Sequence, residues 1–329
     1  MTLSRAAQVV DDHAPDRPLV VAVRAGGASR TWVRGDLPDG AASVFEIGSV
    51  TKTWTATLLA LLATEGVVGL DDPVAAHLPV APPVVGRPIT LTDLATHHSG
   101  LPRLPAGLGR GSVDRREPYA ALDDDAVLRA IPATAPTRPP GERFLYSNWG
   151  AGLLGRALAH AAGTSYADLV ATRITGPLGL DDAWVDLPPA AEHRLAPGHG
   201  WWGRPAGRWH LAGLAAAGGV CATATDLLDF LAIHDPAATG PLADAARETA
   251  RQRHDLGRAG GVGLGWLVTR GDEGPATFRV PHDVLWHNGG TGGYRSFAAV
   301  VPATGDAVVL SARARSVDGL GWRLVRSLA

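Results

Sequence analysis

The sequence predicts an α/β protein of the α+β type, in which an antiparallel sheet flanked by helices is assembled from both ends of the chain. Short apolar runs typical of strands lie near the two termini, while proline-punctuated helical patterns occupy the middle. The 329 residues, 46% of them hydrophobic, can bury a substantial core. We therefore expect a discontinuous sheet lobe from residues 1–70 and 251–329, with a mostly helical lobe inserted at 71–250.

Strand patterns lie at both ends of the chain. The N-terminal ones are two apolar runs joined through Gly26-Gly27, a hairpin signal, and a short third run before Ser49. The predicted N-terminal strands cover residues 19–24, 31–34 and 44–47. The predicted C-terminal strands cover residues 265–270, 277–280, 284–286, 294–301 and 307–311.

Helical patterns fill the region between these strands. A helix with a thick leucine face is predicted from about Val50 to Glu65, with Gly66 as its stop. Further helices are predicted over residues 91–97, 124–130, 148–162, 166–174 and 225–234. A closing helix is predicted from about Val317. The middle of the chain is therefore expected to be mostly helical, with long loops.

The charge balance limits the possible partners. The net charge is −2 and both signs are interspersed, so the sequence has no run of basic residues that would bind nucleic acid or an anionic membrane surface. The N-terminal segment carries Arg5, Asp11 and Asp12 and lacks an apolar run, which argues against a secretory signal in the chain as given. No apolar helix approaches the ~20 residues needed to span a bilayer. We therefore expect a cytoplasmic protein that acts on a small molecule, without nucleic-acid or membrane partners.

Metal and cofactor chemistry find little support in the sequence. The lone Cys221 excludes an intramolecular disulfide and is expected to be a small buried residue. The 12 histidines include His97-His98 but no H-E-x-x-H pattern, and the glycines at 261–265 lead into a strand, the wrong context for a dinucleotide. The G-x-S-x-G turn of α/β-hydrolases is also absent from the sequence. We expect no cofactor.

The chain contains one lysine against 29 arginines, and this Lys52 closes the tetrapeptide Ser49-Val50-Thr51-Lys52. Arginine stays charged in any protein environment, whereas a buried lysine can lose its proton and act as a base. Residues i and i+3 share a helix face, so Lys52 can activate the Ser49 hydroxyl at the start of a helix. An isolated pattern of this kind is more often a helix cap beside a solvated lysine. The scarcity of lysine favours the catalytic interpretation.

The two asparagines of the chain mark two further motifs. Tyr146-Ser147-Asn148 follows a predicted turn and leads into the N-terminal end of a predicted helix. A phenol beside an ammonium group shifts toward phenolate and can relay protons, while a side-chain amide can orient a substrate carbonyl. His287-Asn288-Gly289-Gly290 lies between two predicted strands, and its glycines would let a substrate backbone lie along a strand edge. Taken singly, the first motif could be a half-buried aromatic and the second a hairpin loop.

In this order the three motifs resemble those of the serine β-lactamase and penicillin-recognising family. The resemblance runs from about Leu19 to the C-terminus and includes four surrounding phrases: Phe45-Glu46-Ile47-Gly48-Ser49, Leu70-Asp71-Asp72-Pro73-Val74, His98-Ser99-Gly100-Leu101-Pro102 and Gly218-Gly219-Val220. The sequence looks most similar to the branch that contains class C β-lactamases, DD-carboxypeptidases, D-aminopeptidases and family VIII esterases.

The resemblance implies one β-lactamase-like catalytic unit with its active site in the cleft between two lobes. It implies that Ser49 is acylated, that Lys52 and Tyr146 share the general-base and general-acid work, and that Asn148 contacts the acyl amide of the substrate. The backbone N–H groups of Ser49 and Gly290 would form the oxyanion hole, and Gly289 would lie beside the substrate.

One departure from the family pattern concerns His287. It stands where class C β-lactamases usually carry the lysine of Lys-Thr-Gly, a cation that pairs with a substrate carboxylate. Histidine is charged only part of the time near neutral pH, so carboxylate binding through His287 would weaken as pH rises through about 6.5. This shifts the expected substrates toward esters, amides or D-amino-acid peptides. A β-lactamase or DD-carboxypeptidase proper, an acyltransferase and a non-catalytic acyl-binding scaffold remain alternatives.

Overall fold

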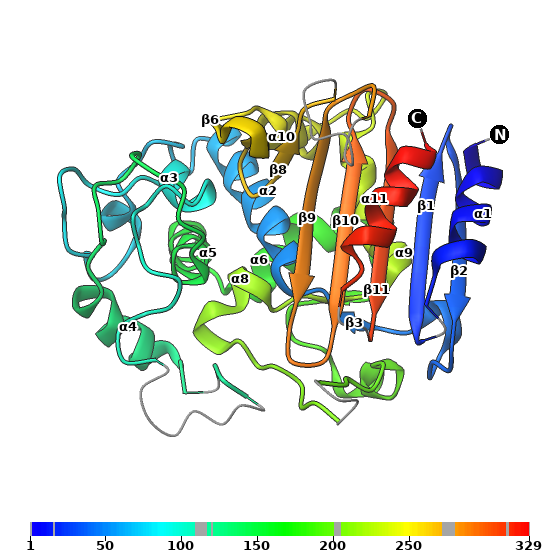
Figure 1. The fold of residues 1–329 in the computed structure, drawn as a ribbon. Coiled ribbons are helices and arrows are strands. Elements are labelled where there is room, and N and C mark those ends of the chain that lie inside the picture. The colour runs from blue at the N-terminus through cyan, green and yellow to red at the C-terminus, as the bar shows by residue number, and fades with distance from the viewer. Residues whose placement is uncertain are drawn as a thin grey trace.

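An antiparallel sheet of eight strands forms the body of the protein in the computed structural model (Figure 1). The structure describes residues 2–15, 17–108, 117–119, 121–200, 205–271, 280–313 and 316–328. The strands follow the order β2-β1-β11-β10-β9-β8-β7-β6. Their bounds are β1 Leu19–Ala25, β2 Ala28–Arg34, β6 His254–Asp255, β7 Gly261–Val262, β8 Leu267–Thr269, β9 Val284–Gly290, β10 Arg295–Val301 and β11 Asp306–Ala312.

The pairing of β1 explains how the two chain ends make one sheet. On one side β1 pairs with β2 through the tight turn at Gly26-Gly27, and on the other it pairs with β11, placing Leu19 opposite Ala312. The prediction of an antiparallel sheet built from both termini is confirmed. The strand predicted over 277–280 lies, except for Val280, outside the described residues.

Helices cover both faces of this sheet. The helices are α1 Thr2–His13, α2 Thr51–Thr64, α3 Leu91–Ala95, α4 Asp124–Ala133, α5 Asn148–Ala162, α6 Tyr166–Val170, α7 Gly176–Leu178, α8 Ala215–Gly218, α9 Ala224–Leu231, α10 Pro241–Ala250 and α11 Asp318–Ser327. In Figure 1, α1 and α11 lie together on one face, and α9 lies behind the sheet against β1 and β11. The prediction of a sheet flanked by helices is confirmed.

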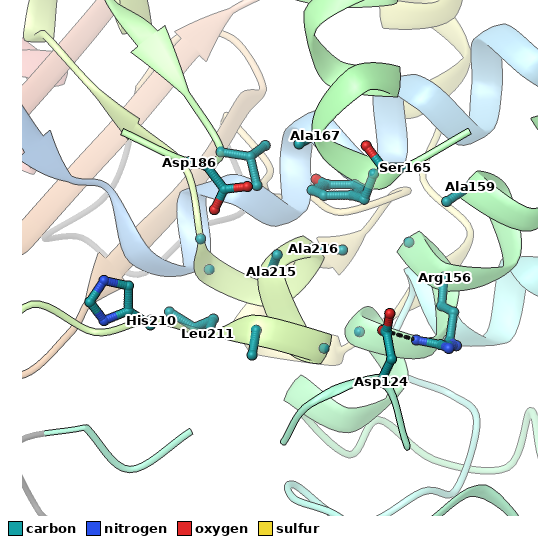
Figure 2. A pocket seen from close by; sticks show the side chains of 18 of the residues that line it. Asp124, Arg156, Ala159, Ser165, Ala167, Asp186, His210, Leu211, Ala215 and Ala216 are labelled. Atoms are coloured by element: carbon teal, nitrogen blue, oxygen red, sulfur yellow. Dashed lines mark hydrogen bonds and ion pairs between the residues drawn. The ribbon is translucent and has the colours of Figure 1, made fainter. Parts of the chain in front are cut away.

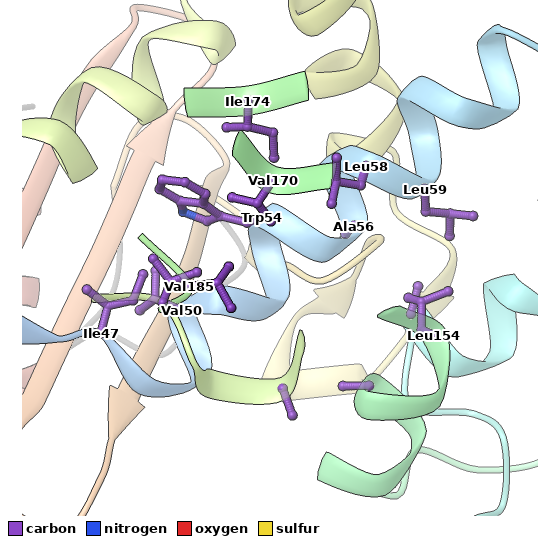
Figure 3. Close-up of a cluster of buried hydrophobic side chains, with 14 of the residues drawn as sticks. Ile47, Val50, Trp54, Ala56, Leu58, Leu59, Leu154, Val170, Ile174 and Val185 are labelled. Carbon is purple, nitrogen blue, oxygen red and sulfur yellow. The ribbon is translucent and has the colours of Figure 1, made fainter. Parts of the chain in front are cut away.

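Helix α2 is the most deeply buried helix of the site region and carries Ser49 at its N-terminal end. Every residue from Thr51 to Leu62 is buried, because the helix is enclosed by α5, α8 and α10 and begins beside β9. Figure 3 shows Trp54 and Leu58 of this helix packed with Val170 and Ile174. A helix held on all sides gives its N-terminal end little freedom, and that end carries Ser49.

The sequence interpretation missed two long helices, α1 and α10, and the short helices α7 and α8. Helix α1 buries Ala6 and Val10 against the outer face of the sheet, and α10 buries alanines against α2 after a proline at its first position. Helices α1 and α10 are amphipathic, but they carry few large apolar residues, and their low overall hydrophobicity made them easy to overlook in the sequence. A separate small sheet is formed by three strands of two residues each: β3 Phe45–Glu46, β4 Ala183–Trp184 and β5 Cys221–Ala222. The division into lobes at residues 70 and 250 stays a prediction.

Candidate active site

Ser49 lies in a tight 3₁₀ turn, Gly48–Val50, between strand β3 and helix α2. Gly48 adopts a φ of 53°, and a Cβ atom there would lie 2.7 Å from the backbone nitrogen of Gly290. Only glycine suits both the conformation and the contact. The first N–H groups of a helical turn have no acceptor within the helix, so the Ser49 N–H is available to a ligand.

Lys52 lies one turn further, with its side chain directed at Ser49. Its Nζ is 3.0 Å from Ser49 Oγ and 2.6 Å from the carbonyl oxygen of Ala217 in α8. Only 3% of the residue is exposed. Burial, and secondarily the positive charge of Arg103, holds the pKa of Lys52 well below its ordinary value. The direction agrees with the expectation that this lysine can be a neutral amine.

Tyr146 completes a compact group with these two residues. Its ring centroid is 4.9 Å from Lys52 Nζ, and its hydroxyl is hydrogen-bonded to Ser49. The predicted shift toward phenolate is wrong, because burial raises the pKa of Tyr146 more than Ser49 and Arg103 lower it. The structure thus pairs a neutral phenol with an amine of depressed pKa.

Asn148, two residues after Tyr146 in the sequence, is the first residue of helix α5. Its backbone N–H donates to the carbonyl of Arg103, and its side chain is hydrogen-bonded to Tyr119. The side-chain oxygen of Asn148 is buried and accepts no hydrogen bond from the described residues. Asn148 does not line the cleft beside Ser49 within the described part of the chain, so its contact with a substrate amide stays a prediction.

The third motif lies in strand β9 and contacts the nucleophile turn. A Cβ atom on Gly289 would lie 2.0 Å from the carbonyl oxygen of Ile47, so the backbones approach too closely for a side chain. The Thr291 N–H donates to the Tyr294 carbonyl across the turn to β10. Because pairs in an antiparallel ladder alternate, the N–H of Gly290 points away from β10, toward the nucleophile turn.

One edge of β9 is open beside this turn. Strand β8 pairs with Val284, Leu285 and Trp286, and its register ends there. The outer edge of β9 from His287 to Gly290 is therefore not covered by β8. A strand edge with unpaired groups can accept an added extended segment.

His287 does not behave as the predicted partial cation. The residue is 4% exposed, and its Nδ1–H donates to the backbone carbonyl of Asn288 at 2.6 Å. Burial, together with the positive charge of Lys52, lowers the pKa of His287 to about 3. We correct the expectation accordingly: His287 is neutral near neutral pH, and a role in substrate binding would have to use the uncharged imidazole.

A cleft of about 400 Å³ brings Ser49, Tyr146, Gly289 and Gly290 together. Charged side chains that the sequence interpretation did not identify also line it: Arg103, Arg295 and Asp318. Arg103 lies 5.2 Å from the Tyr146 ring, while Asp318 accepts a hydrogen bond from the Asn288 amide at 2.9 Å. Asp318 begins α11, and only the packing of α11 on β10 and β11 brings it to β9, so no local sequence signal identifies it.

A larger cavity of about 650 Å³ lies around α8 (Figure 2). In the figure Ala215 and Ala216 lie between the Asp124–Arg156 ion pair and the side chains of Asp186 and His210. Within the described residues its lining includes none of the predicted site residues.

Two sequence expectations concern this larger cavity. Cys221 is buried as predicted, and burial raises the pKa of its thiol to about 12, which leaves it unreactive. The sequence leaves open whether the tryptophan-rich segment 199–210 lines a pocket or packs as a surface loop. Trp209 lines this cavity, whereas Trp201 and Trp202 lie outside the described residues.

The described part of the chain contains neither a cluster of metal-ligating side chains nor a membrane-spanning helix. No group of three or more histidine, cysteine, aspartate or glutamate side chains there is arranged to hold a metal ion. None of the helices described there combines the length and apolar character needed to cross a membrane.

The fold and the Ser49 cleft define a class of protein: a serine hydrolase of the β-lactamase fold. The Beta-lactamase family model matches residues 15–327, and the chain belongs to this family. The D-alanyl-D-alanine-carboxypeptidase/endopeptidase AmpH of Escherichia coli K12 is 31% identical over 279 residues, which is 79% of this chain and 68% of the relative. Penicillin-binding protein 4 of Amycolatopsis lactamdurans is 31% identical over 287 residues, 80% and 70% of the two chains.

Solved structures show the same fold. A class C β-lactamase from Rhodobacter sphaeroides is 26% identical, with a TM-score of 0.80 over 99% of this chain and 97% of its own. A Beta-lactamase/D-alanine Carboxypeptidase from Yersinia pestis complexed with citrate has a TM-score of 0.82 at 24% identity, covering both chains completely. At that identity the likeness concerns the fold alone.

Proposed function

We propose that the protein hydrolyses esters, amides or D-amino-acid peptides through an acyl-enzyme on Ser49. The observation that carries the proposal is the 3.0 Å separation between Lys52 Nζ and Ser49 Oγ, in surroundings that favour the neutral amine. A neutral amine at that distance can take the hydroxyl proton as the oxygen attacks a carbonyl carbon.

In the proposed acylation step, Ser49 Oγ bonds to the substrate carbonyl carbon and its proton passes to Lys52. The carbonyl oxygen becomes an oxyanion, which the N–H groups of Ser49 and Gly290 stabilise. The bond to the leaving group then breaks, and the Tyr146 phenol donates the proton that the departing nitrogen or oxygen needs. The protonated Lys52 then returns its proton to the Tyr146 phenolate, which restores both groups to their starting state.

In the proposed deacylation step, a water molecule replaces the leaving group. Tyr146 and Lys52 take one proton from this water as its oxygen attacks the ester carbonyl, and Ser49 leaves with a proton. The acyl chain would lie along the open edge of β9, where its backbone can bond to Gly290. An amine or alcohol in place of water would make the protein an acyltransferase, and a scaffold without turnover would form no acyl-enzyme.

A small substrate panel tests this proposal. The panel contains p-nitrophenyl esters, D-amino-acid amides, D-Ala-D-Ala peptides and nitrocefin. We expect turnover of the esters or amides, which carry no carboxylate, to exceed turnover of nitrocefin, because His287 supplies no cation for a β-lactam carboxylate. Turnover of nitrocefin above every ester and peptide would favour a β-lactamase proper. Products formed with added alcohol or amine, at the expense of hydrolysis, would favour acyl transfer.

Tyr146→Phe is expected to reduce kcat by about 10²-fold to 10⁴-fold, the contribution typical of a positioned proton carrier. The change removes the phenolic proton and its hydrogen bond to Ser49 with little change in volume. Single-turnover kinetics would separate acylation from deacylation. Wild-type rates for both steps would rule out proton transfer through Tyr146.

Asp318→Asn is expected to raise kcat/KM by about fivefold for substrates whose leaving group carries a carboxylate, because removing a like charge is worth about 1 kcal/mol there. Asp318 accepts a hydrogen bond from the Asn288 amide and lines the cleft with Ser49. Paired measurements on a carboxylate substrate and its methyl ester isolate the charge effect. Asp125→Asn, an exposed acid on α4, is the matched control. Equal changes for both substrates would place Asp318 outside the leaving-group site.

A further inference from the structure

The segment that follows helix α3 contains a histidine in a conformation that normally belongs to glycine. His97 has a φ of 60°, in the left-handed region. The N–H of His98 donates to the carbonyl of Asp93 at 2.8 Å, and the N–H of His97 donates to Leu94. These two bonds form a Schellman motif with His97 at its left-handed position. Glycine adopts that position without strain, so a histidine there needs another reason.

The side chain of His97 supplies that reason, because it contacts Tyr146 and the residues on both sides of it. The two ring centroids are 4.4 Å apart, with a tilt of 42°. The Leu145 N–H donates to the His97 carbonyl at 2.7 Å, and the Ser147 N–H donates to His97 Nδ1 at 3.3 Å. The backbone is therefore bonded to His97 immediately before and immediately after Tyr146.

We propose that His97 is a positioning residue, which holds the Tyr146 hydroxyl against Ser49 through its Nδ1 acceptor and its ring. The proposal rests on the proposed function of Tyr146 as the proton carrier. Neighbouring bonds join the same two segments, from the Gly141 N–H to His98 and from the Thr137 N–H to Gly100. Those bonds fix the loop, whereas the bonds of His97 fix the residue that carries the hydroxyl.

The protonation state of His97 agrees with this role. An N–H group can only donate, so Nδ1 must keep its lone pair and the ring proton must be on Nε2. Burial, with the positive charge of Lys52 as a second cause, holds the pKa of His97 well below its ordinary value. The imidazole is therefore neutral, and the acceptor is available whenever the site is assembled.

Two substitutions separate the acceptor from the ring. In His97→Asn the side-chain oxygen takes the place of Nδ1, and asparagine tolerates the left-handed region. His97→Phe keeps a buried ring against Tyr146 but has no acceptor for the Ser147 N–H. His97→Ala removes both. His98→Asn is the matched control, since His98 is equally buried in the same turn but stacks on His254.

We expect kcat for ester hydrolysis by His97→Asn to stay within about tenfold of wild type, and kcat of His97→Phe and His97→Ala to fall at least about 100-fold, with KM changed less than about threefold. The melting temperature of each variant is measured in parallel. It must lie well above the assay temperature, so that a loss of activity does not reflect unfolding. A merely structural role predicts that each variant keeps the wild-type kcat as long as it is folded at the assay temperature. Wild-type kcat in folded His97→Phe, or a His97→Asn enzyme as slow as His97→Ala, would overturn the proposal.

Hydrogen exchange of the Ser147 amide gives a readout that needs no turnover. We expect slow exchange in wild type, His97→Asn and the His98→Asn control, and faster exchange in His97→Phe and His97→Ala. Equal protection in all of these proteins would refute the acceptor role of Nδ1. A wild-type protein without Ser49-dependent turnover would refute the proposed function instead. The exchange rates of the Ser147 amide in the variants would still decide whether His97 holds this part of the backbone.

Discussion

Replacing Ser49 by alanine is expected to abolish nearly all turnover, a loss of about 10⁴-fold or more for a covalent nucleophile. The alanine keeps the Gly48–Val50 turn and both proposed oxyanion donors, because the lost atom is a side-chain oxygen. Binding of substrate should therefore change little while the chemistry stops. Steady-state rates on the best ester of the panel give the size of the loss.

A fluorophosphonate probe identifies the nucleophile directly. We expect the probe to label wild-type protein at Ser49 and to leave Ser49→Ala unlabelled, with mass spectrometry of the digested protein locating the adduct. Ser99 offers a control, since it follows His98 in the same region and is fully buried. Labelling of the Ser49→Ala protein at the wild-type rate would assign the nucleophile to another residue.

The parts of the site that the sequence predicted are those that local spacing determines. A serine and a lysine three residues apart must share one face of a helical turn, and the structure places them 3.0 Å apart. Helix α5 spans the predicted residues 148–162 for the same reason, since a Ser147 cap opens it and a left-handed Gly163 ends it. The long strands β1, β10 and β11 follow from their apolar runs, whereas the two-residue strands β6 and β7 were not predicted.

The parts that the sequence did not predict depend on burial and on long-range packing. A neighbouring ammonium group suggests that Tyr146 loses its proton easily, and residue type suggests that His287 is partly charged, yet burial moves both pKa values in the opposite direction. Asp318 reaches the cleft only because the start of α11 lies beside β9, and Arg103 only because the segment after α3 packs against Tyr146. His97 attracted notice only as a possible metal ligand, because its left-handed conformation is invisible without coordinates.

Replacing Lys52 by arginine is expected to remove activity almost as completely as replacing it by alanine. The arginine keeps a positive charge at the site but cannot lose its proton, so it cannot accept the proton of Ser49. Lys52→Met is the control for folding, since methionine fills the buried volume without a charge. All three variants are assayed at temperatures where thermal unfolding shows them folded. An active Lys52→Arg protein would reduce Lys52 to a fixed charge and assign the base to Tyr146.

The titration of Lys52 can also be followed in the unmodified protein. Because burial lowers its pKa, the amine stays neutral well below the pH at which an exposed lysine protonates, and kcat/KM should fall only as pH drops through that lowered value. Lys52 and the N-terminal amine are the primary amines of this sequence, so a small amine reagent with mass spectrometry reports on one side chain. We expect the midpoint of modification to match the acid limb of kcat/KM. A midpoint at about 10.4, the value of an exposed lysine, would mean that Lys52 is charged during turnover and cannot be the base.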